Sequence, residues 1–148
     1  MGFGRLLSTT DISASGLAAE RLRMEIVANN IANVHTTSTP GGGPYRRQQV
    51  AFSSAMSESL GREADSVSRS LGGVTVKGVT RDDSELPVVY NPGHPDADED
   101  GFVKMPNVKL PMEMVDLMTA SRAYDANLKS LTVFRQMAEQ SLSLMSGR

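Results

Sequence analysis

The acidic segment at residues 96–101 (DADEDG) is the part of the chain whose residue types are most typical of a binding site. Three aspartates alternate with other residues and a glycine follows, as at the start of a calcium-binding loop, where oxygens coordinate the ion and glycine permits a sharp turn. The twelfth position of such a loop is a bidentate glutamate, but here it is Asn107. Prolines stand where the flanking helices should be: Pro92, Pro95 and Pro106. We therefore interpret the segment as an acidic turn and keep a calcium-binding module as an alternative.

Other groups that could do chemistry are sparse. His35 and His94 are the only histidines, and they lie far apart in sequence on expected loops. The segment Gly41–Pro44 lacks the Lys-Ser/Thr end of a phosphate-binding loop. The chain has no cysteine, which excludes disulfides, thiolate catalysis and cysteine metal sites. These features predict a protein that is not an enzyme, with no catalytic residues, no metal and no cofactor.

The composition limits the partners. The chain has 148 residues, the size of a single domain, with 22% charged residues and a net charge of -2. Its Lys and Arg residues are scattered, whereas a nucleic-acid-binding protein concentrates them on one face, so nucleic acid is not an expected partner. Residues 1–7 have no apolar core of a signal peptide, and no apolar run reaches the ~18 residues of a membrane span. We expect a protein that does not span a membrane and is either cytosolic or exported without a cleaved signal peptide.

A helix is expected from about Ser8 to Asn33. Ser8 and Asp11 have the spacing of a helix N-cap box. The small residues of Ser13–Ala19 include Gly16, which costs about 1 kcal/mol relative to alanine inside a helix. Such a patch predicts either a weak helix or one whose backbone lies close to a neighbour. Apolar residues recur at helical spacing: Ile12, Leu17, Leu22, Met24, Ile26, Val27 and Ile31.

The middle of the chain, about Tyr45 to Pro106, has no helical period. Two β-branched runs, Val74–Val79 and Leu86–Tyr90, predict short strands, and Pro87 makes the second an edge strand. The run Phe102–Met105 is expected to close a small sheet. The polar segment Ser53–Ser70 gives no prediction beyond a possible short helix.

A long C-terminal helix is predicted from Leu110 by apolar residues at alternating spacings of four and three. Its length of about 50 Å exceeds what most small domains need. The heptad positions, broken only by Ser121 and Arg135, are Leu110, Met114, Leu117, Ser121, Tyr124, Leu128, Leu131, Arg135, Ala138, Leu142 and Met145.

The same helix has a second apolar stripe, nearly opposite the first, and a narrow polar strip that includes Lys129. A helix that is apolar on two sides must be buried on two sides. One N-terminal helix cannot cover both, so the pattern indicates contacts with other subunits. The second stripe consists of Met112, Val115, Ala126, Val133, Met137 and Leu144.

Several motifs resemble the flagellar rod, hook and hook-associated family. Its opening signature is similar to Asp11–Leu17 (DISASGL) and Asn29–Asn33 (NNIAN), and its closing signature to Glu113-Met114, Ser121–Tyr124 (SRAY) and Asn127. The middle motifs narrow the resemblance to a subunit of the proximal rod: Gly41–Arg47 (GGGPYRR), Tyr90–Asp96 (YNPGHPD), Gly101 and Pro106–Val108 (PNV).

The resemblance implies a subunit that passes unfolded through the flagellar export apparatus and assembles in the periplasm into the torque-transmitting rod. Its partners would be further copies of itself and other rod proteins of the FlgB, FlgF, FlgG and FliE types. A secreted coiled-coil adaptor or effector of a related export system is the other alternative.

The expected fold class is α+β, with long terminal helices packing as a coiled-coil-like pair around a small β-rich or irregular middle. The expected divisions are an N-terminal assembly helix (1–34), a middle segment (35–109) and a C-terminal heptad helix (110–148). The residues expected to contact other subunits are Leu17, Leu22, Ile26, Asn29, Asn30, Asn33, Met114, Leu117, Tyr124, Asn127, Leu128, Leu131, Val133, Met137 and Leu142.

Overall fold

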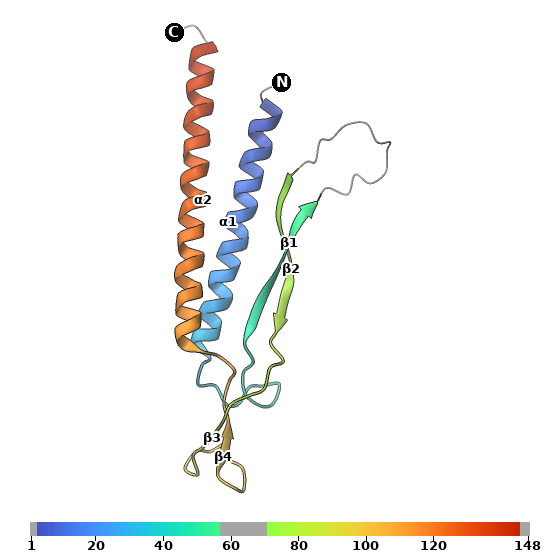
Figure 1. Ribbon diagram of the computed structural model, residues 1–148, viewed down its shortest axis with the longest axis vertical. Coiled ribbons are helices and arrows are strands. Elements are labelled where there is room, and N and C mark those ends of the chain that lie inside the picture. The colour runs from blue at the N-terminus through green and yellow to red at the C-terminus, as the bar shows by residue number, and fades with distance from the viewer. Residues whose placement is uncertain (1–2, 57–70, 146–148) are drawn as a thin grey trace, which may run out of the picture. The chain divides into compact units, whose positions relative to one another are not determined.

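The computed structural model describes residues 3–56 and 71–145, and within them the fold is α+β, as predicted (Figure 1). The two helices are α1 (Phe3–Ala32) and α2 (Leu110–Met145). The strands form two separate two-stranded sheets, β1 with β2 and β3 with β4. Their bounds are Gln48–Met56 for β1, Leu71–Arg81 for β2, Val88–Tyr90 for β3 and Phe102–Lys104 for β4. Neither helix, within the described ranges, is long and apolar enough to cross a membrane.

The chain divides into two compact units. The first unit comprises Met1–Arg21, Phe52–Lys77 and Ser121–Arg148, and the second comprises Leu22–Ala51 and Gly78–Ala120. Each unit therefore contains a part of both helices and of β1 and β2, while β3 and β4 lie wholly in the second.

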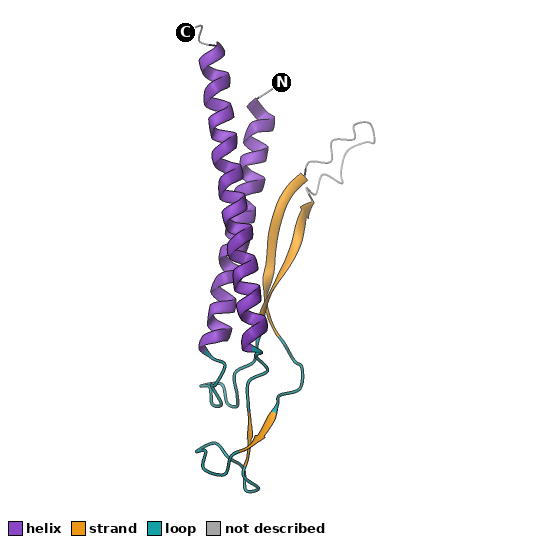
Figure 2. Cartoon of the chain, turned by 60° about the vertical axis from the view of Figure 1, so that its left-hand side comes forward, coloured by secondary structure: helices purple, strands orange, loops and turns teal. Residues whose placement is uncertain are grey.

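Close backbone approach organises the first unit, where the early part of α1 lies beside the late part of α2 (Figures 1 and 2). A Cβ atom added at Gly16 would lie 3.0 Å from Asn127 Nδ2 of α2. On β2, Gly73 has a φ of 80°, and an added Cβ would overlap Ser15 Oγ. The Ser15 hydroxyl donates to Ile12 O (2.7 Å) and accepts from Val74 N (3.1 Å). The small-residue patch thus serves a close approach of α1 to two neighbours, one of the two outcomes expected from the sequence.

Replacing Gly73 by alanine is expected to destabilise the chain by about 2 kcal/mol or more, because a positive φ is strained for any residue with a Cβ. The overlap with Ser15 Oγ adds to this cost, since the hydroxyl cannot rotate away without losing two hydrogen bonds. Urea unfolding followed by circular dichroism measures the change. Gly41→Ala is the matched control, because an added Cβ there meets nothing within 4 Å. Equal effects of the two substitutions would contradict the close approach.

The second unit contains an antiparallel arrangement of the two helices. Arg23 of α1 lies 3.5 Å from Asp116 of α2, and Asn30 donates to Glu113 at 2.9 Å. Between these two contacts the residue number rises on α1, from Arg23 to Asn30, and falls on α2, from Asp116 to Glu113. The two helices therefore run in opposite directions in this unit. Buried apolar side chains in this unit are few and small: Ile26, Val27, Val103, Val108 and Ala120. Polar contacts must therefore do much of the positioning.

A short hairpin completes the second unit. In β3 and β4, Val88, Val89 and Tyr90 pair antiparallel with Lys104, Val103 and Phe102. The rings of Tyr90 and Phe102 meet edge to face with centroids 5.4 Å apart. At Gly101, φ is 80°, and an added Cβ would lie 3.0 Å from the Tyr90 ring. The runs Leu86–Tyr90 and Phe102–Met105 do contain strands, which pair with each other in a sheet separate from β1 and β2, and Pro87 lies immediately before β3.

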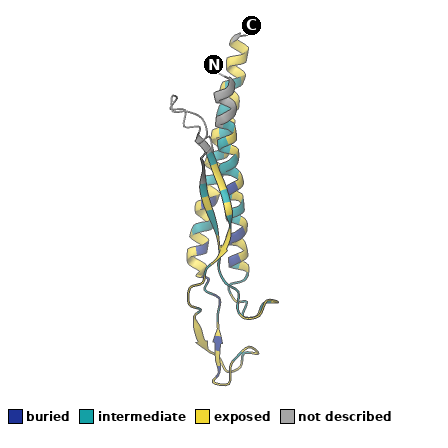
Figure 3. Ribbon diagram, turned by 90° about the vertical axis from the view of Figure 1, so that its right-hand side faces the viewer, coloured by how far each residue is buried: buried dark blue, intermediate teal, exposed yellow. Residues whose placement is uncertain are grey.

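The face of α2 that is turned inward differs from the predicted heptad seam. Four seam positions, Leu117, Tyr124, Leu131 and Ala138, are half-buried. Six other seam positions are exposed in the single chain: Leu110, Met114, Ser121, Leu128, Arg135 and Leu142. The inward face also includes Glu113, Ala120, Asn127 and Phe134. Figure 3 shows that only short stretches of the helices are buried. The prediction favoured large apolar side chains. The real contact uses small residues that allow close approach and polar residues that have partners.

Element boundaries were partly mispredicted. Helix α1 begins at Phe3, so Ser8 lies inside the helix and is not its N-cap. The strand β1 was missed, because its sequence QQVAFSSAM has one β-branched residue and no regular alternation of polar and apolar residues. The predicted strand Val74–Val79 lies within the longer β2, and α2 begins at Leu110 as expected. Most of the segment Ser53–Ser70 lies outside the described residues.

Candidate functional site

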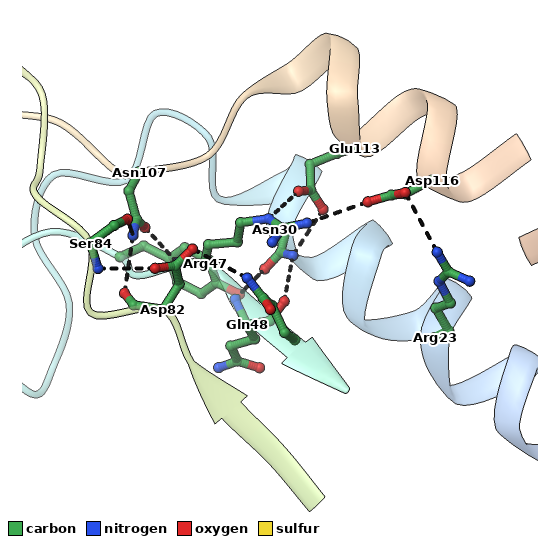
Figure 4. A network of polar contacts seen from close by, with 11 residues as sticks. Arg23, Asn30, Arg47, Gln48, Asp82, Ser84, Asn107, Glu113 and Asp116 are labelled. Atoms are coloured by element: carbon green, nitrogen blue, oxygen red, sulfur yellow. Dashed lines mark hydrogen bonds and ion pairs between the residues drawn. The ribbon is translucent and has the colours of Figure 1, made fainter. Parts of the chain in front are cut away.

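A buried amide, Asn30, is the centre of a polar network near the end of α1 (Figure 4). Its Nδ2 donates to Gln48 O and to Glu113 Oε2, both at 2.9 Å. Its Oδ1 accepts from Gln48 N and from the Tyr45 hydroxyl, also both at 2.9 Å. An asparagine side chain has two donor hydrogens and two acceptor positions on its oxygen. All four are used, so this fully buried amide joins α1, α2 and the segment that enters β1.

The Glu113 carboxylate in the first turn of α2 is also fully buried. The guanidinium of Arg47 donates to Glu113 Oε1 through Nε at 2.5 Å and to Asp116 Oδ2 through Nη2 at 3.3 Å. Arg23 of α1 lies 3.5 Å from the other oxygen of Asp116. A buried carboxylate is tolerated only where it is paired and hydrogen-bonded. Arg47 and Asn30 meet that requirement, and the positive end of the helix dipole favours the charge further.

A second branch of the network runs through Asn107. Its Oδ1 accepts from Arg47 N (2.7 Å), while its Nδ2 donates to Asp82 O (3.0 Å) and Ser84 Oγ (2.9 Å). Asp82 N in turn donates to Arg47 O at 2.8 Å. Hydrogen bonds from the Ser84 backbone and hydroxyl lower the pKa of the half-buried Asp82 carboxyl. The segment before α2 is therefore tied to the segments flanking β1 and β2.

Tyr45 donates its hydroxyl to the centre of this network. Burial raises the pKa of Tyr45, the negative charge of Glu113 raises it further, and Arg81 opposes the rise. The hydroxyl thus stays protonated and can donate to Asn30. Because its pKa is higher in the folded state, Tyr45 contributes to stability at pH values below the unfolded-state pKa of tyrosine. This contribution is lost as the pH rises through the folded-state pKa.

The predicted interface residues fall into three groups. On α1, Ile26 and Asn30 are buried, Leu17 and Leu22 are half-buried and Asn29 is exposed, while Asn33 just beyond the helix is half-buried. On α2, the half-buried members are Leu117, Tyr124, Asn127 and Leu131. The exposed members, with exposed fractions of 44–54%, are Met114, Leu128, Val133, Met137 and Leu142. The sequence analysis did not predict that Arg47, Glu113 and Asn107 form one cluster. Each of them lies in a motif that resembles the flagellar family: Gly41–Arg47, Glu113-Met114 and Pro106–Val108.

The acidic turn uses its carboxylates within the chain. Asp98 Oδ1 accepts from Asp100 N (3.1 Å) and Phe102 N (2.7 Å), and Asp96 Oδ2 accepts from the Thr37 hydroxyl (2.6 Å). His94 Nδ1 accepts from Asp96 N at 3.1 Å. No group of three His, Cys, Asp or Glu residues that could hold a metal occurs among residues 3–56 and 71–145. The interpretation as an acidic turn accounts for these contacts.

Two family descriptions match this chain at its two ends. The family described as "Flagella basal body rod protein" matches residues 11–38, which include Asn30. The family described as "Flagellar basal body rod FlgEFG protein C-terminal" matches residues 99–144, which include Glu113. The buried network therefore connects the two matched segments, with Arg47 contributed by the stretch between them.

Curated relatives align over nearly the whole chain. The flagellar basal-body rod protein FlgC of Borreliella burgdorferi is 39% identical over 150 residues, covering 96% of this chain and 99% of the relative. FlgC of Salmonella typhimurium is 39% identical, covering 94% and 97% respectively. FlgC of Bacillus subtilis is 36% identical, covering 90% and 94%.

The helical ends, the small β-rich middle and these matches define a structural subunit of the bacterial flagellar basal-body rod. It assembles with other basal-body proteins in that rod. Within this class, the chain belongs to the FlgC family.

Proposed function

We propose that this chain is a non-catalytic subunit of the proximal rod, where it self-assembles into a torque-transmitting shaft that also encloses the export channel. Its partners in this proposal are further copies of itself and rod proteins of the FlgB, FlgF, FlgG and FliE types. The chain reaches the periplasm through the flagellar export apparatus, without a cleaved signal peptide. The support for this proposal is membership of the FlgC family together with the exposed apolar surface of α2.

The exposed apolar surface of α2 is the observation that carries the proposal. In the late part of the helix, Val133 is 52% exposed, Met137 44% and Leu144 82%. In the early part, Met112 and Val115 are exposed by more than half. Apolar area exposed to water is unfavourable by roughly 25 cal/mol per Å². A helix with so much uncovered apolar surface is suited to packing against other subunits.

The exposed members of the predicted interface set are proposed to make the direct contacts between subunits: Asn29, Met114, Leu128, Val133, Met137 and Leu142. The half-buried members, Leu17, Leu22, Asn33, Leu117, Tyr124, Asn127 and Leu131, are proposed to act at the edges of these contacts. Ile26 and Asn30, which are buried within the chain, act indirectly by holding the helices in place. In the same proposal, segments 1–34 and 110–148 assemble the rod and segment 35–109 packs between subunits.

Val133→Asp is expected to abolish swimming of a strain that depends on this chain, because assembly would bury an unpaired carboxylate at a cost of several kcal/mol. Lys129→Asp lies on the polar strip of the same helix, within four residues, and is expected to leave swimming nearly unchanged. Swimming in soft agar is the readout, and secretion of each variant into the medium is measured alongside. Leu128→Asp is expected to behave like Val133→Asp, since Leu128 is exposed in the single chain.

Normal swimming with Val133→Asp would show that this face of α2 stays exposed in the rod. Loss of secretion as well as swimming would place the defect in export, and the variant would then not report on assembly surfaces. Failure of the unmodified chain to restore swimming to a strain lacking its FlgC would contradict the proposed function itself.

A further inference from the structure

The second unit contains an open hollow of about 380 Å³ beside the glycine-rich loop. Its lining includes Pro40, Pro44, Tyr45, Gln48 and the two arginines Arg46 and Arg81. Ligand pockets in proteins usually start at about 300 Å³, so the hollow is large enough for two or three side chains of a docking segment.

The two arginines give the hollow a positive wall. The Nη1 atom of Arg46 donates to Asp82 O (3.3 Å) and Ser84 O (3.2 Å), which fixes the guanidinium in place. Asp83, 4.0 Å from Arg46, is almost fully exposed and screens little of its charge. The side chain of Arg81 is exposed and makes no hydrogen bond or ion pair with any residue in the described part of the chain. Arg81 is thus an available cation at the edge of a preformed hollow.

The chain also carries a preformed acidic segment, the turn at residues 96–100. Asp98 fixes its shape by accepting two backbone N–H groups, and Gly101 N donates back to Asp98 O at 3.0 Å. The carboxylates of Glu99 and Asp100 are exposed and have no hydrogen-bond or ion-pair partner among the described residues. A rigid turn loses little conformational entropy on docking, which favours binding.

We propose that the hollow receives the acidic turn of a second copy of this chain, with Arg81 pairing to Glu99 or Asp100 of that copy. The proposal rests on the proposed self-assembly. The charges are complementary, and within one chain no contact joins the turn to Arg81 in the described residues. Two different surfaces of one subunit that fit each other make a head-to-tail contact, which repeats into a ring or a helical filament. Such a contact would link successive copies around the rod.

Cysteine crosslinking tests which molecule occupies the hollow, and the natural chain offers a background free of cysteine. Gly41→Cys places a thiol at the hollow, where an added Cβ meets nothing within 4 Å. Glu99→Cys places one on the turn. Cells that express both single variants together are expected to yield, after oxidation of isolated basal bodies, a dimer of twice the chain mass that neither variant forms alone. A crosslink to a protein of another mass, or no crosslink, would overturn the proposal.

Charge reversal tests the pairing energetically. Arg81→Glu is expected to shrink the swimming ring at least about twofold, since like charges across an interface are unfavourable. Adding Glu99→Arg and Asp100→Arg to Arg81→Glu is expected to restore most of the loss. Lys77→Glu, an exposed reversal on the same strand, is the control and is expected to have little effect.

Unchanged swimming with Arg81→Glu, or a defect that the compensating variant does not relieve, would overturn the proposed contact. These outcomes are separable from failure of the proposed function. If only the proposed contact is wrong, every variant still appears in purified basal bodies and supports a rod. If the proposed function is wrong, the unmodified chain is itself absent from purified basal bodies.

Discussion

Replacing Asn30 by leucine is expected to destabilise the folded chain by at least about 3 kcal/mol, a large fraction of the 5–15 kcal/mol typical of a domain. Leucine has a similar volume but no polar atoms. The substitution would leave four groups without the partner that Asn30 supplies: Gln48 N, Gln48 O, the Tyr45 hydroxyl and Glu113 Oε2. Each buried group left unsatisfied costs about 1–3 kcal/mol. Urea unfolding followed by circular dichroism measures the loss.

The neighbouring Asn29 provides a matched control. Asn29 is the same residue type, one position earlier in the same helix, but its side chain is exposed. Asn29→Leu is therefore expected to change stability by less than about 0.5 kcal/mol. Comparable losses for the two variants would mean that the buried network does not hold the end of α1.

Replacing Arg47 by methionine is expected to destabilise the chain by about 3–5 kcal/mol, because it leaves the fully buried Glu113 carboxylate without its cation. Methionine keeps much of the apolar volume of the arginine stem, so the lost charge dominates. Arg122→Met, an exposed arginine on α2, is the control and is expected to change stability by less than about 0.5 kcal/mol.

A double-mutant cycle separates the ion pair from its surroundings. Glu113→Leu alone leaves Arg47 without its buried partner, although the guanidinium, which is about a quarter exposed, keeps Asp116. Combining Arg47→Met with Glu113→Leu removes both charges, so the double variant is expected to be at least about 1 kcal/mol more stable than the sum of the single effects predicts. Additive effects within about 0.5 kcal/mol would contradict a direct, buried interaction.

The network gives a physical reason why the middle segment matters to the helices. Asn30 comes from α1, Glu113 from α2 and Arg47 from the stretch that precedes β1. Glu113 can be buried between the helices only when Arg47 is present to pair with it. The two helix ends therefore depend on a segment that belongs to neither, which links folding of the middle to correct placement of the surfaces proposed for assembly.

Much of the secondary structure followed from local sequence. Helix α2 was predicted from its first residue, Leu110, because its apolar positions recur at helical spacing and Pro111 fits a first turn. Strand β3 followed from the β-branched run Leu86–Tyr90, and β4 lies in the run Phe102–Met105 that was expected to close a small sheet, although their pairing with each other was not predicted. Strand β1 did not, since its sequence has one β-branched residue and no regular alternation, and its partner strand β2 is distant in the sequence. The motifs at both ends indicated the flagellar rod family, and the alignments confirmed it.

The sequence by itself determined that both ends are helices, that the middle is β-rich and that α2 has more apolar surface than one chain covers. Only the tertiary structure decided which face of α2 is turned inward. Periodicity ranks positions by apolar character, so it favoured Met114 and Leu128 over Glu113 and Asn127. The fold chose the latter because Gly16 makes room for Asn127, and because Asn30 and Arg47, 83 and 66 residues away in sequence, satisfy the buried Glu113 carboxylate. Hydrogen bonds over such separations form only once the chain is folded, and no local pattern encodes them.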